Sequence, residues 1–254
     1  MLRPRSTPGA ETLIADKGWR LQIPTGQNQD YRLSQLDNTN GLERRNFPLK
    51  SSGNLRLRCR ASQLKLPGTW GFGFWNDPFA FSLGLQGMSR RLPVLPNACW
   101  FFYSSPENHL SFQNNLPASG FLAQTFRSPK IPSSLMLPAA LGAPLLYWKN
   151  LSRYLRKLAG KVVIEDSLQL NLDPTDWHNY QLDWNAKIVT FQIDQSIVFQ
   201  TSCSPHGPLG CVIWIDNQYA AWKPDGGLSA GNLPIQSNTW LELEDLEISG
   251  TSKY

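Results

Sequence analysis

The sequence predicts an all-β fold with one inserted helix, and three observations support this. Short segments alternate apolar and polar residues with the period of two that is typical of strands. Turn-forming residues are frequent, with 19 Gly and 19 Pro among 254 residues. Only residues 144–161 show apolar positions at helical spacing. The hydrophobic content of 41% is enough for a core and excludes wholesale disorder.

Several segments are expected to be strands. Residues 54–61 (NLRLRCRA) place four apolar side chains on one face and three arginines on the other, as in a half-buried antiparallel strand. Residues 70–75 (WGFGFW) form the next one. The alternating glycines Gly71 and Gly73 often mark where a ligand or another backbone comes close. Further strands are expected at 99–105, 179–184, 188–193, 196–201, 210–219 and 240–248.

The predicted helix, residues 144–161, is amphipathic. Pro144 suits its start and Gly160 its end. Its apolar face is Trp148, Leu151, Leu155 and Leu158. Its basic face is Lys149, Arg153, Lys157 and Lys161, which Arg156 joins. The simplest interpretation packs the apolar face on the sheets and leaves the basic face solvated. Such a helix can also make peripheral contact with an anionic membrane, or cover a cleft as a lid.

Charge is segregated along the chain. Residues 44–164 carry 16 basic and two acidic side chains, a net +14, whereas residues 165–254 carry a net −9. The first 43 residues are balanced, and the total is +5. If the acidic part folds against the basic part, the two partly cancel, and we expect a mixed, solvated surface. A nucleic-acid partner is therefore not expected.

The chain termini and the cysteines bear on the domain organisation and on the cellular compartment of the protein. Residues 1–10 are expected to be a flexible leader, and residues 11–254 a single domain. The N-terminus lacks the apolar stretch of a secretory signal, and no run of 18 apolar residues exists, so a cytoplasmic location is predicted. The four cysteines have no zinc-type spacing. Buried reduced thiols are expected in that compartment, with a Cys203–Cys211 disulfide as the alternative.

Three segments resemble one known superfamily. Residues 177–184 (WHNYQLDW) and 189–201 (VTFQIDQSIVFQT) resemble a hairpin of the concanavalin A-like lectin/glucanase superfamily, especially family 16 glycoside hydrolases. Residues 68–79 (GTWGFGFWNDPF) and 240–249 (WLELEDLEIS) are similar to two of its other strands. The resemblance spans roughly residues 20–250. It implies a two-sheet antiparallel jelly-roll sandwich in which one sheet curves to form a ligand cleft.

The catalytic motif of these hydrolases is absent from its expected position. That motif is a Glu-x-Asp-x-(x)-Glu strand before the hairpin, yet residues 80–164 contain one acid, Glu107. Glu242, Glu244 and Glu247 have a similar spacing, but they follow the hairpin. If a bulge lies near Asp245, the glutamates face outward and leucines face the core. Ordinary family 16 hydrolysis is therefore not expected. A structural calcium of the superfamily type near this strand remains open, although no ligand spacing supports it.

The candidate site combines aromatic and polar residues that follow apolar strands. The predicted ligand-binding residues are Trp75, Asn76, Trp214, Asn217, Gln218 and Tyr219. The predicted acid/base residues are Asp77, Glu107, His109 and Asp216. Glu107 and His109 share a face if their segment is extended, and such a pair can transfer protons. No metal site or resident cofactor is predicted, because the motifs of metalloproteases, P-loop proteins and serine hydrolases are missing.

Three functional hypotheses remain open at this point. The first is a glycan-binding or carbohydrate-active protein, in which aromatic rings stack on sugars and Asp, Asn and Gln bind hydroxyls. The second is a non-hydrolytic cyclase or isomerase for an apolar, terpenoid- or polyketide-like substrate. In it, Asp77, Glu107 or Asp216 donates a proton and aromatic faces stabilise cations. The third is a sandwich without a ligand, which predicts a shallow, polar concave face. The oligomeric state is not predicted.

Overall fold

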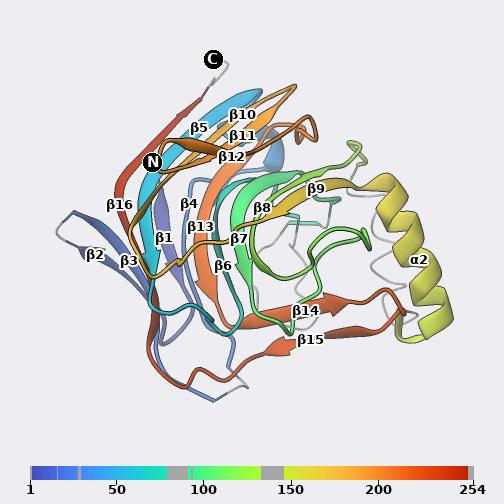
Figure 1. Ribbon diagram of the computed structural model, residues 1–254, viewed down its shortest axis with the longest axis horizontal. Helices are drawn as coiled ribbons and strands as arrows, with labels where there is room; N and C mark the ends of the chain where they lie inside the picture. Colours follow the sequence, from blue (N-terminus) through green and yellow to red (C-terminus); the bar gives the residue numbers. More distant parts are fainter. Residues whose placement is uncertain are drawn as a thin grey trace.

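Two seven-stranded antiparallel sheets make up most of the protein (Figure 1). The computed structural model describes residues 2–15, 17–27, 30–78, 91–92, 94–132 and 146–250. Within these ranges lie the two sheets, a separate two-stranded hairpin, one short 3-10 turn, η1 (Arg44–Asn46), and one α-helix. The architecture confirms the predicted all-β jelly-roll sandwich with one inserted helix.

The first sheet, called the cavity sheet below, is strongly curved (Figure 1). Its order is β1 (Arg3–Ser6), β4 (Leu33–Asp37), β13 (Gly210–Asp216), β6 (Thr69–Trp75), β7 (Ala98–Ser104), β8 (Gly120–Arg127) and β9 (Ile164–Gln169). The predicted leader, residues 1–10, contains β1, which pairs with β4 along its whole length. Within the predicted leader, residues 3–6 therefore belong to the cavity sheet.

The second sheet, called the outer sheet, contains the predicted meander. Its order is β12 (Ser196–Thr201), β11 (Val189–Ile193), β10 (His178–Asn185), β5 (Ser52–Ala61), β16 (Thr239–Gly250), β3 (Gly18–Ile23) and β2 (Glu11–Ala15). The β11–β12 turn is Asp194-Gln195, and both residues have positive φ. This is the backbone that a two-residue hairpin turn requires. The separate hairpin is β14 (Gln218–Trp222) and β15 (Leu228–Asn232).

The core lies between the two sheets and is rich in aromatic rings. Phe72 of β6 packs edge-on against Tyr180 of β10 with ring centroids 5.0 Å apart. Phe101 of β7 and Phe191 of β11 are perpendicular, with centroids 5.1 Å apart. Each such side chain contributes roughly 1.5–3 kcal/mol on burial. These contacts connect strands from both sheets, so they fix the sandwich and with it the curvature of the cavity sheet.

The β5–β16 pairing brings together residues from the basic and the acidic parts of the sequence. It places Glu242 beside Arg60 and Glu244 beside Arg58 on the outward face. Glu242 also contacts Arg20 of β3, with 3.5 Å between the carboxylate oxygen and the guanidinium nitrogen. Basic residues from the first half of the chain are thus neutralised by acids from its end. On this face the surface is mixed, as predicted.

The predicted bulge in the last strand is confirmed. Asp245 has a φ of 50°, and the register with β5 shifts between Glu244 and Glu247. Leu241 and Leu243 are fully buried before the bulge. Leu246 and Ile248 pack against the same core after it. The glutamates therefore face outward, away from the concave side of the cavity sheet.

The helix forms, but its buried side differs from the prediction. The α-helix α2 spans Lys149–Val162 and continues two residues beyond Gly160. The predicted start at Pro144 lies outside the described residues. The side chains that α2 buries are those of Ser152 and Arg156, whereas Trp148 is exposed. Arg156 is thus not on a solvated basic face.

Hydrogen bonds explain this orientation of α2. The Arg156 guanidinium donates to the carbonyl oxygens of Trp222 and Ser111, at 2.9 Å each, and to Asn114 at 2.7 Å. The Trp222 indole N–H donates to the Ser152 hydroxyl at 2.9 Å. Apolar periodicity did not predict this packing because polar contacts determine it.

The cysteines are buried and free: Cys59, Cys99, Cys203 and Cys211. The alternative Cys203–Cys211 disulfide does not form. Burial raises the pKa of the Cys203 and Cys211 thiols, which keeps them protonated. They act as small apolar side chains in and beside the core.

We expect Glu242→Ala to lower the free energy of unfolding by about 1 kcal/mol, because it removes the ion pairs to Arg20 and Arg60. Urea denaturation at low salt and in 1 M NaCl measures this, and the loss should shrink in high salt. Glu247→Ala is the matched control, since Glu247 lies outside the ion pairs seen in the described part of the chain. Equal losses for both variants would contradict the prediction.

Candidate functional site

A deep cavity of about 940 Å³ opens on the concave side of the cavity sheet. Its floor comes from β4, β13, β6, β7 and β8, and one wall from the hairpin β14–β15. The wall is predominantly apolar, and its aromatic members are Tyr31, Trp75, Trp100, Phe102, Phe112, Phe126, Trp214, Tyr219 and Trp222. The hypothesis of a sandwich without a ligand predicts a shallow, polar concave face, and this cavity contradicts it.

Strand alternation places the aromatic rings in the cavity. Trp70, Phe72 and Phe74 of β6 face the core, so Gly71, Gly73 and Trp75 face the cavity. A Cβ on Gly71 would lie only 2.8 Å from the Trp214 ring of the neighbouring strand. The glycines therefore make room for flat indole rings on the sheet.

Four rings form a continuous aromatic floor. The indoles of Trp75 and Trp214 are parallel within 6°, with centroids 6.4 Å apart. Trp100 lies 5.5 Å from Trp214, and Phe102 lies 5.7 Å from it. A flat apolar surface of this kind suits a sugar ring, a cation or a fused-ring hydrocarbon.

Asp216 supplies the polar end of the cavity. It is the last residue of β13, and its carboxylate accepts hydrogen bonds from the Thr69 hydroxyl at 2.8 Å and the Thr69 amide at 3.2 Å. The Thr69 hydroxyl also accepts one from the Trp214 indole at 2.9 Å. The Tyr31 hydroxyl is a further partner of the carboxyl group. The acid, the hydroxyls and the aromatic floor are thus one connected network.

Burial dominates the electrostatics of this network. It raises the pKa of Asp216 to about 7, although the hydrogen bonds from Thr69, Gln218 and Tyr31 oppose the shift. Burial and the nearby Asp216 also raise the pKa of Tyr31 well above its ordinary value. Near neutral pH the cavity therefore holds a carboxyl group that can both give and take a proton.

Gln218 carries an unused donor at the same end. It begins β14, and its backbone N–H donates to Asp216 at 3.3 Å. Its side-chain amide nitrogen is buried, yet no acceptor for it exists among the described residues. A buried N–H without a partner is uncommon in folded proteins. Tyr219 follows in the cavity wall, with its ring against Gly231 of β15.

His109 lines the side of the cavity nearest to α2. Its Nε2 lies 3.3 Å from the Arg156 guanidinium. Burial, together with Arg156, lowers the pKa of His109 below its usual range. Because the guanidinium can only donate, Nε2 is the acceptor and the ring proton is on Nδ1. His109 is thus a neutral imidazole held by α2.

Asp77 lies at the other end and is bound to protein groups. Its carboxylate pairs with the Arg91 guanidinium, and it is 5% exposed. Arg44 donates to the Asp77 carbonyl at 2.6 Å and to the Asn76 carbonyl at 2.8 Å. Here the acid has a clear structural role, because it helps to hold Arg91 at the rim.

Three predicted residues lie outside the cavity lining. Asn76 hydrogen-bonds the backbone of Leu95 and Asn97. Asn217 is fully buried and bonds to backbone groups of Asp30, Arg32 and Leu233. Glu107 is exposed in a turn, so the extended segment that would place it beside His109 does not form. The other seven predicted residues line the cavity.

The sequence did not single out other parts of the site. Trp100 and Phe102 occupy the cavity-facing positions of β7, and Gln124 and Phe126 those of β8. Gln124 accepts the Trp100 indole N–H at 3.1 Å. These cavity-facing positions of β7 and β8 therefore hold aromatic and amide side chains and no carboxylate. The period-two pattern of residues 99–105 could have identified Trp100, but Tyr31 lies in a loop with no such signal.

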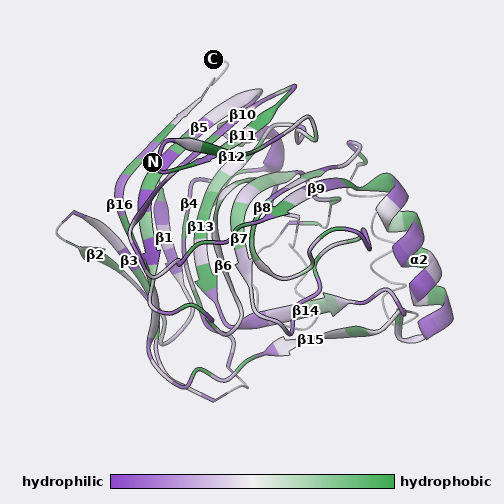
Figure 2. Ribbon diagram, viewed as in Figure 1, coloured by the Kyte–Doolittle hydropathy of each residue, from purple (hydrophilic) through white to green (hydrophobic). Residues whose placement is uncertain are grey.

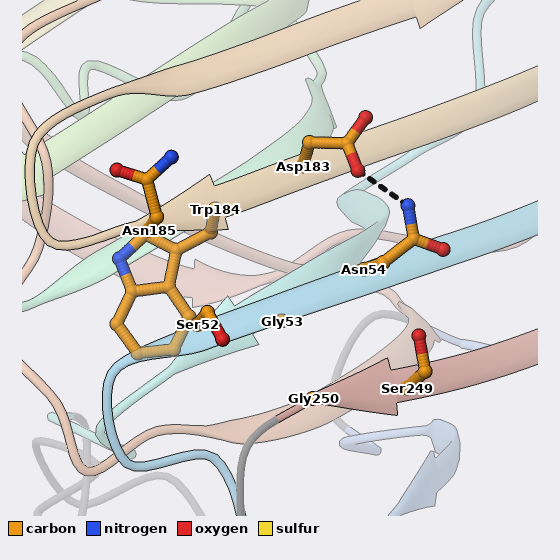
Figure 3. A pocket seen from close by; sticks show the side chains of 8 residues that line it. All are labelled: Ser52, Gly53, Asn54, Asp183, Trp184, Asn185, Ser249 and Gly250. Carbon is orange, nitrogen blue, oxygen red and sulfur yellow. Dashed lines mark hydrogen bonds between the residues drawn. The ribbon is translucent and has the colours of Figure 1, made fainter.

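A second hollow, of about 300 Å³, lies at one end of the outer sheet (Figure 3). It is open, and Asn54 donates there to the Asp183 carboxylate. Gln181 also donates to Asp183, at 2.6 Å. Because neighbouring side chains already satisfy this acid, the hollow is a weaker candidate than the cavity.

Among the described residues, no three His, Cys, Asp or Glu side chains group as metal ligands. No helix within that part of the chain is long and apolar enough to cross a membrane.

No protein-family model matches the chain, and no curated protein does. Similar solved structures include a Crh5 transglycosylase in complex with NAG (11% identity, TM-score 0.49, 98% of this chain and 79% of that one). Another is LamAcat from Zobellia galactanivorans (13% identity, TM-score 0.47, 93% of this chain and 79% of that one). A third is the Emp47p carbohydrate recognition domain (13% identity, TM-score 0.45, 98% of this chain and 89% of that one). The chain spans only 17% of a similar sialidase and 43–44% of two other similar chains.

We expect the stability of the protein to fall between pH 4 and pH 7 because of Asp216. Its folded-state pKa of about 7 lies above the unfolded value of 3.8, so the stability it contributes is complete below pH 4 and is lost as the pH rises through 7. The pKa difference corresponds to about 4 kcal/mol. Asp216→Asn should abolish this pH dependence. The stability of the variant should therefore increase relative to that of the wild type as the pH rises. Denaturation curves at pH 4, 5.5 and 7.5 measure it, and parallel profiles would contradict it.

Proposed function

We propose that the cavity binds a carbohydrate ligand. Trp75 and Trp214 offer parallel indole faces on which a sugar ring can stack. Asp216, Gln218 and Tyr219 lie along the same cavity and offer the polar groups that orient hydroxyls. The volume of about 940 Å³ accommodates an oligosaccharide of a few units.

The observation that carries this proposal is the unpartnered amide of Gln218. Its buried side-chain nitrogen has no acceptor in the described part of the chain, and it lies in the cavity wall. A ligand oxygen would satisfy it and recover the cost of burying the donor, about 1–3 kcal/mol. An apolar ligand alone would leave that cost in place. The site therefore favours a ligand with both a flat face and an oxygen acceptor.

The carboxyl groups argue for binding without ordinary hydrolysis. Glycoside hydrolysis uses two carboxyl groups on opposite sides of the scissile bond. Asp37 accepts bonds from Gln35 and Thr39, and Asp77 pairs with Arg91. Burial raises the pKa of Asp216, whereas protein groups engage the carboxylates of Asp37 and Asp77, the other buried acids of the described cavity wall.

Trp75→Ala and Gln218→Ala should each weaken the binding of the best ligand from a soluble-oligosaccharide array by about tenfold or more. The first removes a stacking face and the second the free donor. Isothermal titration calorimetry measures the affinities. Trp177→Ala is the matched control, because Trp177 lies on the outer sheet side against Arg58 and Arg60. Its binding should equal that of the wild type. An array without binding, or equal affinity for Trp75→Ala, would refute the proposal.

A second candidate is acid-catalysed, non-hydrolytic conversion of an apolar substrate, with Asp216 as proton donor. One observation supports it: a carboxyl group with a pKa of about 7 adjoins the aromatic floor of a mainly apolar cavity. A protonated acid can start a cyclisation or isomerisation, and the rings of Trp75, Trp100 and Trp214 can stabilise a developing cation.

Asp216→Asn distinguishes the two candidates. For a catalyst, turnover of a terpenoid- or polyketide-like substrate should drop by at least a hundredfold while the ligand still binds. For a binding protein, the variant should retain its oligosaccharide within a few-fold, with no turnover to lose. Turnover by Asp216→Asn at the wild-type rate would exclude the catalytic candidate, and intrinsic tryptophan fluorescence follows binding in both cases.

A further inference from the structure

The outward side of α2 combines exposed aromatic and apolar residues. Tyr147, Trp148 and Tyr154 are 79%, 68% and 59% exposed. Leu158 and Val162 lie further along and are about 40% exposed. Isolated apolar residues on a surface are ordinary, but three on α2 and two directly before it form a patch that water solvates poorly.

Cations border this patch. Lys149, Arg153, Lys157 and Lys161 are all exposed and recur every four residues, so they form a stripe along the helix. The described segment 146–164 contains no acidic residue. The purple and green bands on α2 in Figure 2 show the basic and apolar residues together on this helix.

The seating of α2 explains why both kinds of residue face outward. At 100° per residue, Ser152 and Arg156 lie on the side that contacts the hairpin and the loop at Ser111. Tyr154 and Leu158 are then roughly opposite to this side. Because polar residues anchor the helix, Tyr154 and Leu158 face the solvent, whereas Leu151 and Leu155 are half-buried.

We propose that α2 docks onto an anionic lipid surface. Trp and Tyr are the residues that prefer the membrane–water interface, and Lys and Arg are attracted by anionic headgroups. Charge selects this occupant over a second copy of the chain, since a symmetric contact through α2 would bring two positive stripes together. The docking is independent of the ligand proposed for the cavity.

Sedimentation of the full-length chain with lipid vesicles tests the docking. We expect binding to vesicles of phosphatidylcholine with 30% phosphatidylglycerol, and much weaker binding to pure phosphatidylcholine or in 0.5 M NaCl. The double variant Lys149→Ala/Lys157→Ala should lower the affinity for anionic vesicles about 30-fold, because each lysine near the surface contributes about fivefold and the two effects multiply. Trp148→Ala should lower it by about tenfold.

Matched controls come from exposed residues elsewhere. Lys187→Ala and Ile197→Ala remove an exposed cation and an exposed apolar side chain far from α2 in the sequence, and both should bind like the wild type. No binding to anionic vesicles, or equal losses in the controls, would overturn the proposal. So would self-association in ultracentrifugation that Trp148→Ala abolishes. Soluble polyglutamate provides one more test. If it binds wild type and Trp148→Ala equally and fully displaces the vesicles, the partner of the helix is an acidic polypeptide, and the lipid proposal is overturned.

Discussion

The cavity sheet is apolar on both of its faces, and the other parts of the structure depend on this. All seven residues of β13 and of β7 are buried. One face packs on the outer sheet and forms the core, and the other carries Trp100, Phe102 and Trp214. An open antiparallel sheet normally exposes one face to water. The second apolar face therefore needs a cover, which the hairpin β14–β15 and the loops around Ser111 supply in part. What they leave uncovered is the cavity.

The cover introduces buried polar groups, and protein partners satisfy several of them. Glu165 accepts hydrogen bonds from the Ser111 hydroxyl and from the backbone N–H groups of Phe112 and Gln113. Arg156 satisfies the carbonyls of the same loop and of Trp222. The Gln218 amide is a contrasting case, since its donor has no acceptor beside Asp216 among the described residues. The proposed carbohydrate site rests on this donor, because an unmatched buried N–H is uncommon in folded proteins.

Local alternation made much of the fold predictable. The faultless pattern of residues 54–61 predicted β5, and the polar residues that follow apolar strands pointed to Trp75 and Asp216, which both line the cavity. The outward glutamates of β16 and its bulge at Asp245 also followed from spacing. Long-range contacts were not predictable in this way. Arg156 is buried because the hairpin offers it carbonyl acceptors. Tyr31 joins the site from a loop, and Glu107 leaves it because its segment turns.

The cancellation of charge is another long-range effect, because the local sequence pattern does not show which charged residues meet. A count along the chain suggested a strongly basic middle part and an acidic last part. Pairing of β5 with β16 brings these two parts within one hydrogen-bonded ladder, where Arg58 and Arg60 each meet a glutamate and an indole ring. The cations of α2 lie far from this acidic strand in the architecture (Figure 1), and Asp225 in the hairpin turn is the acid that acts on Lys149. Only their position in the fold distinguishes them from the arginines of β5.

The attachment of α2 to the hairpin has a mechanical consequence. Ser152 bonds the indole of Trp222, Arg156 bonds its carbonyl, and Gly226 lies against the backbone of Lys149. Trp222, Ser111 and His109 are themselves cavity wall. The helix and one side of the cavity are therefore joined by a few short hydrogen bonds. A substitution that displaces the helix would for this reason also displace groups that line the interior space.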